Sequence, residues 1–201
     1  MHVTISRYAG AAGRIGVAAP KVQQGFVPML NGQQGFLVYA AFASEQGDIV
    51  AILIWERAAA AASSRDKIRG WVQGNLTGFD EPTERFSGDV GLHTILAPPS
   101  GGQDQPLYCM VRTVENLASN DMNRPITEAV LAAAQKQPGF RGAYFARSDD
   151  DPTRGASVLF YDNRENAAAA HDVSLPIVRE RRPESPIRVA ASGMTSVLAM
   201  A

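Results

Sequence analysis

The chain has 201 residues and is 45% hydrophobic, which allows one sizeable core or two small ones. Its 19 Lys and Arg nearly balance its 20 Asp and Glu, and no long run of one sign occurs. This excludes the basic footprint of nucleic-acid binding and a polybasic contact with a membrane. The single cysteine, Cys109, rules out an intramolecular disulfide, and its apolar surroundings in the sequence are typical of a buried thiol.

The first half of the chain predicts a strand, a helix, two strands, a helix and a strand, in that order. The expected elements are 3–8, 21–30, 36–42, 49–55, 58–76 and 84–95. The strands at 36–42 and 49–55 are nearly continuous apolar runs, which indicates that both of their faces are covered. Pro28 lies inside the first helical pattern and predicts a kink or a late start, because it has no backbone N–H to donate.

The second half repeats this order after a segment rich in proline and glycine, 98–106, which is typical of a linker. The expected elements are 107–114, 125–137, 140–146, 156–161, 164–181 and 187–200. The acidic turn at 149–151 lacks the glycine and the distal glutamate of a calcium loop, so we interpret it as a solvated hairpin.

An internal repeat connects the two halves. Gly35-Phe36 and Gly139-Phe140 each stand where a helix runs into a strand, and the two glycines are 104 positions apart. Each half is therefore predicted to be a ferredoxin-like βαββαβ unit, with its helices on one face of a four-stranded sheet. The other sheet face is apolar and needs a cover. We predict an α+β protein with repeats at 1–97 and 107–201, packed sheet to sheet as an intrachain pseudo-dimeric α/β barrel.

This pattern resembles the dimeric α/β barrel superfamily and, within it, the antibiotic biosynthesis monooxygenase (ABM)-like domains. The resemblance is carried by the motifs 34–36 and 137–140, by the strand end 52–56 before an Ala-rich helix, by Trp71-Val72-Gln73-Gly74-Asn75-Leu76, and by Ala170-His171. It implies oxidation of small aromatic or enolisable compounds by O2 without a metal or other cofactor. Haem degradation in another branch uses an Asn, a Trp and a His, a set that this chain divides between its halves.

The residues that could carry such chemistry are few. His171 lies on a helix among alanines, where an imidazole has room to act as a base. Tyr144 and Arg112 lie on strands of the same half and could stabilise an enolate oxygen. These three are the predicted catalytic residues. The predicted substrate-binding residues all lie in the first half: Tyr8, Tyr39 and Trp71.

Each of these residues also has a purely structural interpretation, as a core tyrosine, a core tryptophan or a helix-face histidine. The three histidines are far apart and have no cysteine or carboxylate at ligand spacing, so no metal site is expected. The alternatives left open are a noncatalytic protein that binds a small apolar or aromatic ligand, a structural protein that pairs with a second copy, and haem binding through His171. The N-terminus lacks the features of a signal peptide, and no apolar run reaches the about 18 residues of a spanning helix, so we expect a cytoplasmic protein.

Overall fold

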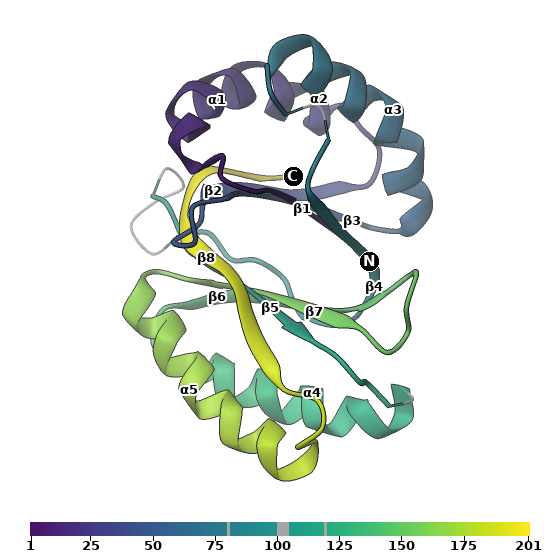
Figure 1. Ribbon diagram of the computed structural model, residues 1–201, viewed down its shortest axis with the longest axis vertical. Helices are drawn as coiled ribbons and strands as arrows, with labels where there is room; N and C mark the ends of the chain where they lie inside the picture. Colours follow the sequence, from purple (N-terminus) through teal and green to yellow (C-terminus); the bar gives the residue numbers. More distant parts are fainter. Residues whose placement is uncertain (80, 100–104, 119) are drawn as a thin grey trace. The chain divides into compact units, whose positions relative to one another are not determined.

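The computed structural model describes residues 1–79, 81–99, 105–118 and 120–201, so the predicted linker 98–106 lies partly outside the described residues. The described chain forms two compact units, Met1–Asp89 with Thr195–Ala201 (unit 1) and Val90–Met194 (unit 2). Figure 1 shows that each unit has its helices on one face of its strands. Both units therefore have a sheet face that is covered by helices. The candidate site lies on this face of unit 2.

In unit 1 the central strands are β1 (His2–Tyr8), β3 (Ile49–Trp55) and β2 (Phe36–Ala43). They pair antiparallel, with Tyr8 opposite Ile49 and Tyr39 opposite Leu53. The first part of β4 (Glu84–Thr94) pairs with β1, and the end of β8 (Ile187–Met200) pairs with β2. The helix α3 (Ala58–Asn75) follows β3, as the sequence predicted.

The first helical segment of unit 1 differs from its prediction. It begins with a 3-10 turn at Ala12–Arg14 and continues through α1 (Ile15–Lys21), a π-helical turn at Val22–Phe26 and α2 (Val27–Asn31). The prediction placed its start near residue 21. The alanines at 18 and 19 support an earlier helix. Pro28 cannot donate to the preceding turn, and the wide π turn lies where that hydrogen bond is missing.

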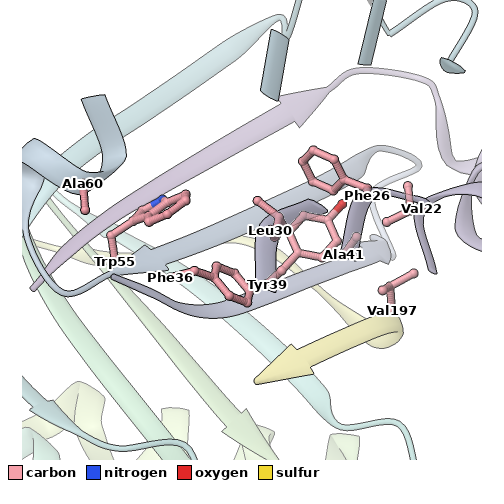
Figure 2. Close-up of a cluster of buried hydrophobic side chains, with 9 residues drawn as sticks. All are labelled: Val22, Phe26, Leu30, Phe36, Tyr39, Ala41, Trp55, Ala60 and Val197. Atoms are coloured by element: carbon pink, nitrogen blue, oxygen red, sulfur yellow. The ribbon is translucent and has the colours of Figure 1, made fainter. Parts of the chain in front are cut away.

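The core on the helix side of unit 1 is built from aromatic and aliphatic side chains (Figure 2). Trp55 of β3 is 1% exposed and packs edge-on against Phe36, with ring centroids 5.7 Å apart. Phe26 of the π turn contacts both Tyr39 and Trp71, with centroid separations of 5.2 and 4.9 Å. Trp55 is thus a buried anchor of this core, and Trp71 packs against the cluster from α3, as its structural interpretation predicted.

Unit 2 repeats the strand arrangement with β5 (Tyr108–Val114), β7 (Gly155–Tyr161) and β6 (Phe140–Ser148). These strands are antiparallel, and the first part of β8 pairs with β5. The helices are α4 (Asn120–Gln135) and α5 (Arg164–Arg181). The helix α4 begins before the predicted position 125, so Pro125 lies inside it and removes one backbone donor without ending the helix.

Among the described residues there are eight strands, in the closed hydrogen-bonded order β1-β3-β2-β8-β5-β7-β6-β4. The long strands β4 and β8 each continue from one unit into the other. The predicted mixed α+β class is confirmed. Cys109 is fully buried, and its burial raises the pKa of the thiol, which confirms the buried-thiol interpretation. In the part of the chain that the structure describes, no helix is both long and apolar enough to cross a membrane.

Candidate functional site

The most unusual side chain of unit 2 is Arg112, which lies on the helix side of the sheet and is only 1% exposed. In the register of β5 it stands between Ser157 of β7 and Val189 of β8, and Phe145 of β6 is the next residue across from Ser157. Cross-strand partners share a sheet face, so these four side chains form one row facing the helices. An arginine therefore occupies the middle of a face that is otherwise packed with apolar side chains.

The guanidinium of Arg112 is only partly satisfied within the described chain. Its Nε donates a hydrogen bond to Ser157 Oγ at 3.1 Å, whereas both terminal nitrogens are buried without a partner. Burial lowers the pKa of Arg112 to about 10, so the group still carries its charge near neutral pH. A buried charge without a counter-ion costs several kcal/mol. This arrangement can bind an anion, because an anion would both pair the charge and occupy the free donors.

His171 of α5 lies close enough for the charge of Arg112 to act on it. Its side chain is half-buried, at the border of the buried helix stripe that contains Ala167 and Ala170, and its Nδ1 is buried without a partner in the described structure. Desolvation lowers the pKa of His171, and the charge of Arg112 lowers it further. The imidazole is therefore neutral near neutral pH and can accept a proton. The structure brings two of the three predicted catalytic residues, Arg112 and His171, to one face of unit 2.

Two residues that the sequence interpretation did not select complete this site. Ser157 holds the Nε of Arg112, and the hydroxyl of Tyr161 donates to the carbonyl of Ala134 in α4 at 3.4 Å. Burial raises the pKa of Tyr161, while the neighbouring charge of Arg112 opposes that rise. The available signal was that Ser157 and Tyr161 are the hydroxyl-bearing residues of an otherwise apolar strand, at positions that share one face.

Tyr144, the third predicted catalytic residue, points to the opposite face of the sheet. It pairs with Val158, which neighbours Ser157 in β7, and successive residues of a strand alternate between faces. Its hydroxyl accepts a hydrogen bond from the backbone N–H of Leu96 at 3.1 Å, and its ring stacks on His93. The structure therefore does not bring Tyr144 together with Arg112 and His171.

The predicted substrate-binding residues Tyr8, Tyr39 and Trp71 all belong to unit 1. Tyr39 and Trp71 pack against Phe26, and Figure 2 shows Tyr39 inside the cluster with its hydroxyl oxygen near Phe26. Tyr8 packs edge-on against Phe79, with ring centroids 5.2 Å apart. Burial raises the pKa of both tyrosines, so neither phenol ionises near neutral pH. These three residues lie on the helix side of unit 1, and the buried charged residues of the described part of that unit include no lysine or arginine.

The comparisons with known proteins give matches at the level of structure. No family model matches the sequence, and no curated protein matches it. A protein from Fusobacterium nucleatum subsp. nucleatum described as a candidate monooxygenase has a TM-score of 0.70 at 10% identity, covering 99% of this chain and 94% of that one. A second candidate monooxygenase, from Lactobacillus acidophilus NCFM, has a TM-score of 0.67 at 12% identity and covers 99% and 95%.

A third similar structure is a mutant chlorite dismutase from Candidatus Nitrospira defluvii, solved in complex with cyanide. It has a TM-score of 0.63 at 12% identity and covers 98% of this chain and 90% of that one. At these identities the likeness establishes the fold alone. The predicted resemblance to the dimeric α/β barrels with ABM-like domains is confirmed at that level. Because proteins named for different reactions share this fold, the function has to be argued from the site.

Proposed function

We propose that the helix side of unit 2 binds a small enolisable aromatic compound and oxidises it with O2, without a cofactor. The observation that carries this proposal is the buried guanidinium of Arg112, whose terminal nitrogens have no partner within the described chain and whose charge helps to lower the pKa of His171. A base beside a fixed cation is the arrangement needed to remove a proton from carbon and to hold the resulting oxyanion. The monooxygenase-like fold of the structural neighbours is compatible with this chemistry.

The reaction follows from these two side chains and O2. His171 takes a proton from the acidic carbon, and the electron pair of that C–H bond moves into an enolate whose oxygen pairs with Arg112. The enolate carbon donates electrons to O2 and forms a C–O bond, and a proton completes a hydroperoxide. Loss of water then breaks the O–O bond and the second C–H bond, which leaves a carbonyl. One oxygen atom enters the product and the other leaves as water, so no further reductant is needed.

Tyr144 is the predicted catalytic residue that lies apart from Arg112 and His171. Its hydroxyl accepts a hydrogen bond from Leu96 and lies on the other sheet face from Arg112. We therefore assign proton removal to His171 and oxyanion binding to Arg112, and Tyr144→Phe becomes a test of whether the tyrosine also takes part. Tyr8, Tyr39 and Trp71 remain proposed ligand contacts of unit 1.

Oxygen consumption tests the proposal. With anthrone as the probe, and with a chelator present, we expect uptake of one O2 for each ketone oxidised. His171→Asn should lower the rate by about 100-fold or more, the usual contribution of a positioned general base. His93→Asn makes the same substitution at an exposed histidine of the same unit and should leave the rate unchanged. Uptake no faster than the uncatalysed rate, both with anthrone and with the 1,3-diketone benzoylacetone, would overturn the proposal.

The alternatives give different results in the same preparation. A ligand that binds with dependence on Arg112 but without oxygen uptake supports a noncatalytic binding protein. A Soret shift on titration with haem that is lost in His171→Asn supports haem binding. Sedimentation at increasing concentration shows whether two copies of the chain pair. Each result separates one alternative from the oxidation proposed above.

We also propose the tandem organisation predicted from the sequence, with ferredoxin-like repeats at 1–97 and 107–201 joined by 98–106. Two observations support it. The four strands of the first repeat follow the order β4-β1-β3-β2, and those of the second follow β8-β5-β7-β6, which is the same order. Gly35 and Gly139 also both adopt positive φ, at 76° and 67°, before their strands.

A further inference from the structure

We propose that the substrate is a 1,3-dicarbonyl compound, whose enolate presents two oxygens to Arg112; this inference rests on the function proposed above and specifies its substrate class. This inference depends on the hydrogen-bond donors of Arg112 that have no partner in the described structure. The hydrogen bond from Nε to Ser157 occupies the side of the guanidinium, and both terminal nitrogens are buried without partners in the described structure. The edge of the guanidinium that carries Nε is therefore occupied. A ligand would meet the opposite end, which carries the two terminal nitrogens.

The end of a guanidinium presents two parallel N–H donors, one from each terminal nitrogen. This geometry matches an anion that shares one negative charge between two oxygens, and such bidentate pairs are the strong ones. An enolate with one oxygen would have to accept from both terminal nitrogens through bent hydrogen bonds, which are weaker than two straight ones. A 1,3-dicarbonyl enolate satisfies both nitrogens. It is also formed by loss of a proton from an acidic carbon, which is the step assigned to His171.

The residues around Arg112 favour a ligand that carries one negative charge and is apolar elsewhere. The groups whose charges act on it or on His171 are Tyr161, Asp172 and Arg179, and burial raises the pKa of Tyr161 so that its phenol stays neutral. Phe145 stands across Ser157 in the same row as Arg112, and the core on this side of the sheet includes Met110, Leu131 and Val189. The described residues around Arg112 therefore supply one positive charge, two terminal nitrogens without partners and apolar neighbours.

A pair of matched ketones tests this inference. Benzoylacetone carries the 1,3-dicarbonyl group, and butyrophenone is a related ketone without the second carbonyl. We expect benzoylacetone to bind the protein about 10-fold or more tightly than butyrophenone. Binding should also convert it to the enolate, seen as the enolate absorption band at a pH where the free diketone is largely un-ionised. This readout needs no oxygen and is made under anaerobic conditions.

Two variants of Arg112 distinguish the effect of its paired N–H donors from the effect of its charge. Arg112→Met removes both and should abolish the enolate band. Arg112→Lys keeps a cation but lacks the paired donors, so the preference for the diketone should fall towards equal binding. Arg188→Met, at an exposed arginine of β8, is the matched control and should bind benzoylacetone like the native chain.

The possible outcomes distinguish this inference from the proposed oxidation. An enolate band that depends on Arg112, without oxygen uptake in air, supports the substrate class and overturns the oxidation. Oxygen uptake with anthrone but equal binding of the two ketones supports the oxidation and overturns the substrate class. No binding of benzoylacetone, or an enolate band retained in Arg112→Met, also overturns the substrate class.

Discussion

The helix sides of the two units have the same register but hold different chemistry. In unit 1, Ser6 of β1 pairs with Ala51, whereas at the same place in unit 2 Arg112 pairs with Ser157. Both cores combine aromatic rings with alanines, but the two tryptophans, Trp55 and Trp71, belong to unit 1. The buried, partly unsatisfied charge of Arg112 has no counterpart at Ser6, and this difference supports the proposal that ligand chemistry belongs to unit 2.

The largest expected effect tests whether the aromatic side chains of unit 1 stabilise the fold. Trp71→Ala removes an indole that packs on Phe26 at a centroid separation of 4.9 Å and that would lie 3.0 Å from a Cβ at Gly25. We expect the free energy of unfolding to fall by about 3 kcal/mol, the low end for a tryptophan truncation because this side chain is only partly buried. Urea denaturation measures it. Unchanged stability with weaker ligand binding would instead assign Trp71 the binding role predicted from the sequence.

A second effect, of opposite sign, concerns the charge of unit 2. Arg112→Met replaces a buried cation that has two unpaired nitrogens in the described chain by an apolar side chain. We expect the free energy of unfolding to rise by about 2 kcal/mol, since removing buried charge in favour of apolar packing is often stabilising. Arg188→Met, at an exposed site, should change it by less than about 0.5 kcal/mol. A less stable Arg112→Met protein would mean that the arginine serves the fold.

The repeated glycines allow the two units to be compared at one backbone position. Gly35 and Gly139 have φ of 76° and 67°, so alanine is strained at both, by about 1 kcal/mol. A Cβ at Gly139 would also lie 2.5 Å from Asn166 Nδ2, whereas at Gly35 the nearest atom is 3.1 Å away. Chemical denaturation should therefore show a larger loss for Gly139→Ala than for Gly35→Ala. Gly91→Ala, with ordinary φ and open space, is the control.

The smallest effect is a pH dependence in unit 2. The pKa of His171 is lowered below its ordinary 6.5 by desolvation and by Arg112. Between the folded and unfolded pKa values the unfolded chain binds more protons, so stability falls as the pH drops through 6.5. His171→Asn should remove this acid-side loss, measured as the difference in unfolding free energy from native protein across that range.

Arg112→Met should reduce the same dependence, because it removes the second cause of the lowered pKa of His171. Parallel pH curves for the native chain, His171→Asn and Arg112→Met therefore test whether the two groups interact. If Arg112→Met leaves the dependence unchanged, the proposed interaction between Arg112 and His171 is wrong.

Much of the fold was predictable because it depends on local patterns. The hairpin strands and the helix α3 were read from apolar runs and periodicity, and their bounds differ little from the prediction. The first helix was placed too late, since the wide turn at Val22–Phe26 satisfies the backbone around a proline in a way that periodicity does not describe. The site was only half predictable. Arg112 and His171 were selected by residue type, but Ser157 was missed because its importance depends on its cross-strand partner.

The sequence by itself determined the order of most elements and the α+β class, because apolar spacing and turn residues act over a few positions. Only the tertiary structure decided which polar groups meet. It set Arg112 opposite Ser157 and placed His171 where the charge of Arg112 lowers its pKa. It also turned Tyr144 to the other face of the sheet. The physical reason is that strand register and side-chain direction are long-range properties, and a shift of one residue moves a side chain to the opposite face.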